Sequence, residues 1–319
     1  MDAAERTLFA EGIRHVLEED GDAGGRDAAL EHLGWPDALA TDPATAIGVL
    51  FECQGRTTTN SSALDRVLAS ALGIDAPGTA VVLPPLRRTD TPGRLAGNHR
   101  TVEGLCTVSL DHATSVLVVA GTGDDGGAVV CSVEPQQLQR RAVGGLDPTL
   151  GLSEVSGAFE RADVVAAVDW PGAVALGQLA LGHELVGAGR AMLELARTHA
   201  LERVQFGRPI GGFQAVRHRL AETLVALEAA AALLDAAWEE GAPATAAMAK
   251  AFAGRSARTA ARHCQQVLAG IGFTTEHPLH HSVRRTLVLD QVLGAGSGLT
   301  RDLGLDMLDR AALPPAFAL

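Results

Sequence analysis

The chain has 319 residues, of which 47% are hydrophobic and 20% are charged, and it carries a net charge of −12 at pH 7. This composition indicates a folded protein with a sizeable core and excludes a disordered chain. The acidic balance argues against nucleic acid as a partner, because neutralising phosphate groups requires a basic surface.

The N-terminal sequence and the cysteines predict a cytoplasmic protein. The first residues include acids and lack the long apolar run of a secretory signal. No stretch reaches the ~18 apolar residues that span a bilayer. The four cysteines are far apart and none belongs to a CxxC pair. We therefore expect reduced thiols, with neither a disulfide framework nor a zinc site.

Residues 1–77 are predicted to form an N-terminal helical domain. Apolar residues recur there with helical spacing in three stretches. These stretches are residues 3–18, 44–53 and 61–72. Gly21, Gly24 and Gly25 are expected to break the chain after the first helix.

Residues 78–170 are predicted to form a small middle β domain. Short β-branched runs separated by turn residues are typical of antiparallel strands joined by loops. The runs are residues 80–83, 114–120 and 128–133. The last two are expected to pair as a hairpin around the glycine string 121–127. That string is not a phosphate loop, since it lacks the GK[ST] ending and a following helix.

Residues 171–319 are predicted to form a C-terminal helical bundle. Four apolar stripes with a period of 3.6 residues predict four helices. They cover residues 181–196, 213–234, 244–268 and 283–293. Gly211 and Gly212 separate the first two helices, and Gly270 and Gly272 end the third. The connections are fairly short, which favours an up-and-down bundle and an α+β fold with a β layer between two helical domains.

Two blocks in this bundle carry a family resemblance. The first is ALERVQFGRPIGGFQAVRHRLAE at 200–222, and the second is QQVLAGIGFTTEHPLHHSVRR at 265–285. They resemble, in content and spacing, the arginine-containing signature and the glutamine–glycine signature of the acyl-CoA dehydrogenases. The resemblance is weak in the β segment and only architectural at the N-terminus. It implies the three-domain acyl-CoA dehydrogenase fold.

The resemblance also implies contacts to FAD, which in this family reach across to the flavin of a neighbouring subunit. The residues that match these contacts are Arg203, Gln205, Phe206, Ile210, Gln214, Gln266 and Gly270. Arginine suits the pyrophosphate because it binds bidentately and stays charged. Glycine lets phosphate and ribose approach the backbone. Two structural alternatives remain open: a solvated pair with Glu202 or a helix cap at Arg203, and a helix C-cap at Gly270 and Gly272.

The sequence departs from the family at the catalytic base. These enzymes use a carboxylate to remove the α-proton of an acyl thioester, while hydride passes from the β-carbon to the flavin. The two positions used for this base fall on Leu293 and near Gly177, and neither carries an acid. Asp290 and Glu184 are the alternative bases, although acids at such positions are usually just solvated. We therefore predict no catalytic residue in this chain.

The β segment departs from the family as well. It lacks the Thr-Glu-Pro and Trp-Ile-Thr strings that hold the flavin ring, and Trp170 is expected to lie in the core. This combination resembles the shorter, non-catalytic subunit of the heteromeric acyl-CoA dehydrogenases of steroid-degrading actinobacteria. The short length, the EHPLHH string and the RRTLVLDQVLG ending agree with that subgroup. The resemblance implies FAD as cofactor, a catalytic acyl-CoA dehydrogenase subunit as partner in an α2β2 assembly, and an acyl-CoA substrate.

Three other interpretations are open at this stage. One is a self-sufficient homodimeric flavoenzyme with a displaced base, and another is a flavin-free scaffold or regulatory protein with the same fold. A metal site at Glu276, His277, His280 and His281 is disfavoured, because Pro278 interrupts the run and no further cluster stands nearby.

Overall fold

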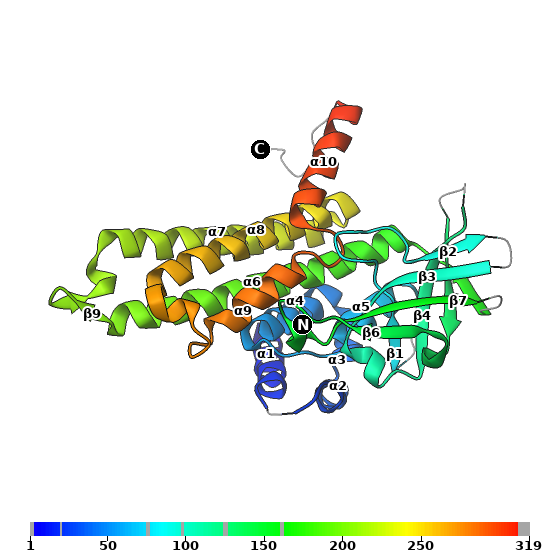
Figure 1. The fold of residues 1–319 in the computed structure, drawn as a ribbon, viewed down its shortest axis with the longest axis horizontal. Helices are drawn as coiled ribbons and strands as arrows, with labels where there is room; N and C mark the ends of the chain where they lie inside the picture. The colour runs from blue at the N-terminus through cyan, green and yellow to red at the C-terminus, as the bar shows by residue number, and fades with distance from the viewer. Residues whose placement is uncertain are drawn as a thin grey trace.

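The structure is a computed structural model that describes residues 3–19, 21–74, 77–96, 99–123, 127–159 and 163–311. Helices at the N-terminal end, a twisted sheet and a bundle of long helices follow one another along the chain (Figure 1). The α+β class and the acyl-CoA dehydrogenase-like architecture predicted from the sequence are confirmed. In the described part of the chain, no helix is long and apolar enough to cross a membrane.

Five helices form the N-terminal part. They are α1 (Ala3–Glu18), α2 (Ala23–His32), α3 (Trp35–Thr41), α4 (Pro43–Thr57) and α5 (Ala63–Ala71). The expectation that Gly24 and Gly25 break the chain is wrong, because both lie in the first turn of α2. Asp22 caps this helix by accepting a hydrogen bond from the Gly25 N–H at 2.8 Å. A good N-cap compensates for the weak helix propensity of the two glycines.

The middle part is an eight-stranded sheet. Its strands are β1 (Thr79–Val81), β2 (Gly93–Ala96), β3 (His99–Cys106), β4 (Ser115–Gly121), β5 (Ala128–Val133), β6 (Gln139–Ala142), β7 (Ser153–Phe159) and β8 (Asp163–Ala167). The expected β4–β5 hairpin is confirmed, with Val116 opposite Val133. The expectation of antiparallel strands fails at two places, because β1 and β2 both run parallel to β4. Short 3-10 turns, η1 (Val108–Asp111), η2 (Pro135–Gln137) and η3 (Pro148–Leu150), connect the strands.

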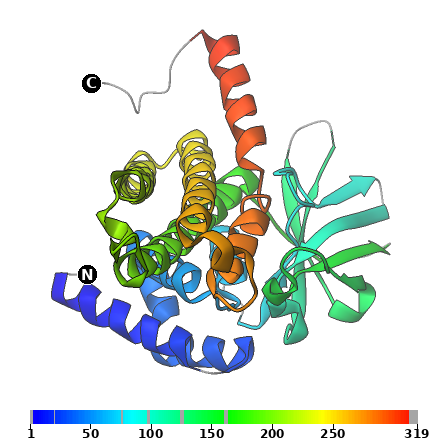
Figure 2. The ribbon, with the colours of Figure 1, turned by 60° about the vertical axis from the view of Figure 1, so that its left-hand side comes forward.

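Long helices form the C-terminal part. They are α6 (Trp170–Glu202), α7 (Gln214–Glu240), α8 (Pro243–Leu268), α9 (Leu279–Leu289) and α10 (Gly296–Arg310). The first four correspond to the predicted helices, whereas α10 was not predicted and rises away from the body of the molecule (Figures 1 and 2). Trp170 is buried, as expected, and its indole N–H donates to the Thr89 carbonyl at 2.9 Å.

Helices α4 and α6 pack closely because glycines meet backbone at their crossing. A Cβ atom at Gly187 would lie 2.1 Å from the Glu52 carbonyl oxygen, and one at Gly55 would lie 2.1 Å from the Glu184 carbonyl oxygen. Only glycine allows backbones to approach this closely. One apolar core therefore runs from α4 and α5 through α6 into the bundle.

Candidate functional site

The arginine signature forms a hairpin at the tip of the bundle. Helix α6 ends at Glu202, and Arg203 caps it by donating its N–H to the His199 carbonyl at 2.9 Å. Strand β9 (Val204–Gln205) then pairs with β10 (Arg208–Pro209). The hairpin lies at the end of the bundle farthest from the sheet (Figure 1). A hairpin thus stands where the sequence suggested only a glycine linker.

The turn of this hairpin holds Phe206 out of the core. Phe206 and Gly207 have φ angles of 53° and 77°, so both are left-handed. Phe206 is 92% exposed, and its ring meets the Phe213 ring edge-on, with centroids 6.1 Å apart. A left-handed conformation is unfavourable for phenylalanine but not for glycine. The tight turn is therefore possible because its second residue is Gly207, which adopts a positive φ without strain.

The other residues matched by the resemblance lie around this tip. Arg203, Gln205 and Gln214 are exposed, while Ile210 is half-buried. Ile210 packs against the small core of the bundle end and donates its N–H to the Arg203 carbonyl at 2.8 Å. No ion pair between Arg203 and Glu202 is present among the described residues, so the alternative of a solvated pair receives no support there.

Gln266 and Gly270 come from the end of α8. Because α6 to α9 alternate in direction, the ends of α6 and α8 and the starts of α7 and α9 share one end of the bundle (Figure 1). Both Gln266 and Gly270 are exposed, and a Cβ atom at Gly270 would meet nothing within 4 Å. The residue that caps α8 is Ala269, with φ 52°, so the C-cap interpretation of Gly270 is wrong. Local packing does not require glycine at this position.

The bundle tip exposes apolar side chains as well as the arginine. The large exposed ones are Leu201, Val204, Phe206, Ile271 and Phe273. The 3-10 turn η5 (Ala269–Phe273) carries two of them. Several large apolar side chains exposed at one end of a bundle are typical of an interaction site.

Gly177 and Leu293, the two positions that the resemblance aligns with the family's base, lie side by side in the structure. A Cβ atom at Gly177 would lie 2.5 Å from Leu293 Cδ1 and 3.1 Å from Leu68 Cδ2. Leu293 is fully buried and lies beyond the end of α9, with φ 52°. The side chain of Gln178 fixes this turn by donating to the Leu293 carbonyl at 2.9 Å. Apolar groups therefore fill the point that both positions share.

Asp290 is not solvated, contrary to the expectation from sequence. Only 1% of it is exposed, because it lies against α8. Its Oδ2 atom pairs with Arg258 and accepts from Gln291 Nε2, while Oδ1 has no hydrogen-bond partner in the described structure. A Cβ atom at Gly254 would overlap Oδ1, so this oxygen faces helix backbone. The carboxylate is enclosed and bound within the protein.

Lys250 lies beside Asp290 and was not singled out from the sequence. Its Nζ atom donates to the Asp290 carbonyl at 3.2 Å and to the Gly294 carbonyl. Burial lowers the pKa of Lys250 to about 7. It is the only lysine of the chain and stands in an alanine-rich stretch, which is the signal that could have drawn attention to it. Together these bonds hold the turn that carries Leu293.

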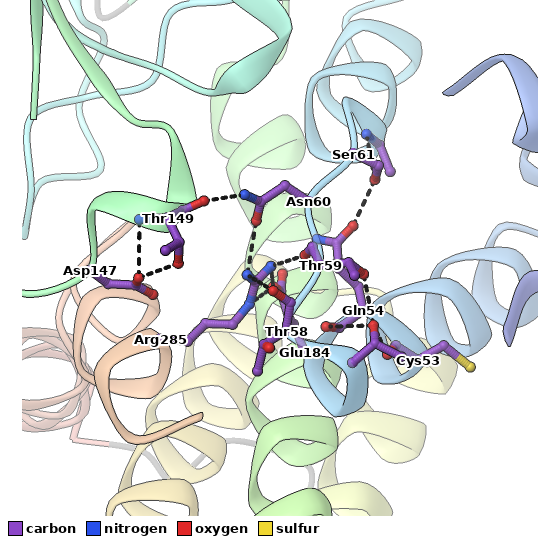
Figure 3. A network of polar contacts seen from close by, with 12 residues as sticks. Cys53, Gln54, Thr58, Thr59, Asn60, Ser61, Asp147, Thr149, Glu184 and Arg285 are labelled. Atoms are coloured by element: carbon purple, nitrogen blue, oxygen red, sulfur yellow. Dashed lines mark hydrogen bonds and ion pairs between the residues drawn. The ribbon is translucent and has the colours of Figure 1, made fainter. Parts of the chain in front are cut away.

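Glu184 is likewise buried and paired. Arg285 Nε donates to Glu184 Oε1 at 2.7 Å, and both residues are about 2% exposed. The remaining donors of Arg285 reach Asn60 Oδ1 at 2.8 Å and the carbonyls of Thr58 and Thr59 (Figure 3). Asn60 in turn donates to the Thr149 carbonyl in the β part. The network therefore joins α6, α9, the α4–α5 loop and η3, the turn between β6 and β7.

A small cavity of about 40 Å³ lies beside this network. Polar groups of Gln54, Asn60 and Glu184 face leucines such as Leu83 and Leu181 across it. A cavity of this size holds a water molecule or two and no acyl chain.

The histidines after η5 have structural roles. His277 Nδ1 accepts from the Leu279 N–H at 3.2 Å, and His280 Nδ1 lies 2.8 Å from the His277 carbonyl oxygen. The rings of His280 and His281 lie against each other at a tilt of 37°, with centroids 3.9 Å apart. Over the described ranges, no group of three or more His, Cys, Asp or Glu residues is placed to hold a metal ion.

Comparison with known proteins agrees with this architecture. Residues 172–303 match the family described as acyl-CoA dehydrogenase, C-terminal domain. The acyl-CoA dehydrogenase IpdE2 of Mycobacterium tuberculosis is 29% identical over 245 residues, which cover 73% of this chain and 76% of that protein. FadE34 of the same organism is 36% identical over 157 residues, covering 43% of this chain but only 22% of its own length.

Solved structures share the whole fold. The ChsE4–ChsE5 complex from Mycobacterium tuberculosis matches with a TM-score of 0.78 at 19% identity, covering 98% of this chain and 99% of that chain. A variant of the Tcur3481–Tcur3483 steroid ACAD matches with a TM-score of 0.78 at 23% identity, covering 97% and 96%. The C-terminal helical domain of this chain therefore belongs to the acyl-CoA dehydrogenase family, and the chain as a whole has that family's fold.

Proposed function

We propose that this chain is the non-catalytic subunit of a cytoplasmic, heteromeric FAD-dependent acyl-CoA dehydrogenase. The observation that carries the proposal is the meeting of Gly177 and Leu293 at one apolar point. Both positions at which the family places a base are present, face each other and carry no acid. The partner subunit then supplies the carboxylate for α-proton removal.

The two alternative acids support the same conclusion. A general base must reach the substrate proton and exchange its own proton readily. Asp290 is enclosed by Arg258, Gln291 and helix backbone, and Glu184 is bound to Arg285. Both carboxylates are committed to structural pairs. A self-sufficient homodimer with a displaced base is therefore disfavoured.

The small volume of the cavity beside the Glu184–Arg285 network also supports a non-catalytic subunit. The cavity between Glu184, Leu83 and Leu181 has a volume of about 40 Å³. A pocket that encloses a drug-sized ligand measures roughly 300–1,000 Å³. This cavity has no room for an acyl chain, and we propose that the partner binds it. The steroid-derived acyl-CoA is proposed from the likeness to the steroid ACAD structure.

The bundle tip is proposed as the FAD-nucleotide site. Arg203 is exposed at a helix end and its guanidinium can bind a pyrophosphate bidentately. Gln205, Phe206, Ile210, Gln214, Gln266 and Gly270 are the further proposed contacts. Open space at Gly270 leaves room for a phosphate or ribose against the backbone. FAD, when bound, supplies the hydride acceptor, while these residues hold its nucleotide end.

The partner is a catalytic acyl-CoA dehydrogenase subunit in an α2β2 assembly. The exposed apolar residues of the tip, of which Phe206 and Phe273 are the most exposed, favour a protein surface that covers them. Helix α10 offers a second such surface, since Leu305 and Leu308 are exposed on a helix that projects from the body (Figure 2). The proposed domains are residues 1–77, 78–170 and 171–319.

Expression with and without a partner tests the proposal. The chain alone should purify without flavin, and FAD absorbance with dehydrogenase activity should appear only on co-expression with a full-length dehydrogenase. An active, flavin-loaded homo-oligomer would contradict the half-site. If the co-purified complex is active but Arg203→Ala leaves its flavin content unchanged, the chain is a scaffold instead.

A further inference from the structure

A cavity of about 280 Å³ lies on the side of the molecule that the proposed flavin contacts do not reach. Its walls come from α2, α3, α5, β1 and η1, which gather where the N-terminal helices meet the sheet (Figure 1). None of the residues proposed above for FAD lines it, nor do Gly177 and Leu293. It is therefore a separate feature of the fold.

Most of this cavity is apolar. Leu30, Trp35, Pro36, Ala63 and Ala69 form its walls. The indole N–H of Trp35 donates to the Ala46 carbonyl at 3.0 Å, which fixes the ring in place. With its N–H engaged, the ring offers the cavity apolar and π surface. Walls of this kind with a few polar groups are typical of small-molecule sites.

Asp27 is the charged group that decides which ligand fits. Its Oδ1 accepts from the Ser62 N–H at 2.8 Å and its Oδ2 accepts from the Ser62 hydroxyl. Among the described residues, no ion pair of Asp27 is present. Burial raises the pKa of Asp27, with the Ser62 bonds opposing this. A partly desolvated carboxylate without a cation in contact is costly, and binding a cation directly relieves that cost.

The other charges of the lining do not satisfy Asp27. Arg66 lies 3.6 Å from Glu31 and forms a pair with it. The His112 ring stands beside Gly24, where a Cβ atom would lie 3.4 Å from Nε2. Each Asp27 oxygen accepts one hydrogen bond from Ser62 and keeps a second lone pair that can accept a hydrogen bond from a ligand. Arg26 and His112 act on Asp27 from a longer distance, but among the described residues no cation is in contact with its carboxylate.

We propose that this cavity binds a small organic monocation, an ammonium group carried on a single ring or a short apolar chain. The ammonium donates to Asp27, and the apolar body packs against Trp35 and Leu30. A cation near an indole ring gains a further attraction from the ring quadrupole. The ligand would join α2 and α5 to the β1 end of the sheet, so its binding stabilises this contact.

Benzylammonium is the probe, with benzyl alcohol and benzoate as the neutral and anionic controls of similar shape. The full chain has three tryptophans, so its indole N–H signals can be separated by NMR and Trp35 assigned with Trp35→Phe. Benzylammonium should shift the Trp35 signal saturably. Benzyl alcohol should bind at least about tenfold more weakly, because it lacks a charge-assisted bond.

Two variants separate the charge from the cavity. Asp27→Asn keeps an acceptor for Ser62 and should weaken benzylammonium binding at least about tenfold. Asp22→Asn, at the exposed cap of the same helix, should leave binding unchanged. Ala28 lines the cavity and is exposed, so Ala28→Phe places a ring in the cavity while keeping Asp27, and it should abolish binding even if Asp27→Asn fails to fold. Equal binding of the alcohol, no saturable shift, or full binding by Ala28→Phe would overturn the proposal.

Discussion

Replacing Glu184 by glutamine tests how the buried network holds the chain together. The substitution keeps the size of the side chain but leaves the Arg285 guanidinium without its counter-ion at a site that is about 2% exposed. Removing one partner of a buried pair costs about 3–5 kcal/mol. The acceptors at Thr58, Thr59 and Asn60 remain, so we expect a loss near the lower end of that range, about 3 kcal/mol.

Urea unfolding followed by circular dichroism measures this loss. Glu228→Gln is the matched control, because Glu228 also pairs with an arginine, Arg190 at 2.9 Å, but is half-exposed. Exposed pairs contribute about 1 kcal/mol or less. If Glu184→Gln and Glu228→Gln lower the free energy of unfolding equally, the idea that the Glu184–Arg285 pair is a buried structural lock is wrong.

Three further predictions concern single residues. Lys250, the only lysine, should titrate near pH 7 in NMR of lysine-labelled protein, because burial lowers its pKa. The free energy of unfolding should therefore rise as the pH increases from about 7 towards the pKa of an unfolded lysine, and fall as the pH drops. A titration near 10.5 would refute this. Arg203→Ala should weaken FAD retention in the complex by about 1.5–3 kcal/mol without changing its assembly, whereas Arg197→Ala, also exposed on α6, should leave flavin content unchanged. Gly187→Ala should lower the free energy of unfolding by at least about 1–3 kcal/mol, since the added Cβ would lie 2.1 Å from the Glu52 carbonyl oxygen. Gly270→Ala should change the free energy of unfolding by no more than about 0.5 kcal/mol. Equal effects of the two substitutions would contradict the packing described.

Local patterns predicted much of the fold. Helical periodicity located α1, α4 and the long helices α6 to α8, because each has a continuous apolar stripe. Helix α2 was not predicted, because the two glycines in its first turn are weak helix formers and outweigh the N-cap signal of Asp22. Helix α10 escaped notice because its outer part has no buried face within the chain. Parallel pairing of β1 with β4 depends on contacts between distant strands, which no local pattern records.

The candidate site, like the fold, was predictable from local patterns only in part. The arginine signature is a local string, so sequence alone picked out residues 200–222 as the candidate cofactor segment, whereas the β9–β10 hairpin and its Phe206–Gly207 turn were found only in the structure. The contact between Gly177 and Leu293 joins residues far apart in sequence and needed the structure. The burial of Asp290 and Glu184 was also invisible, because their partners Arg258 and Arg285 lie on other helices. Sequence could name the acids but not their surroundings.

The most direct test of the half-site is the flavin content of the co-purified complex. Absorbance of released FAD, divided by the protein concentration and combined with the native mass, gives the number of flavins per assembly. We predict one FAD for every two chains, with none bound when this chain is purified alone. One FAD for every chain, or bleaching of a flavin in this chain alone by an acyl-CoA, would contradict the account.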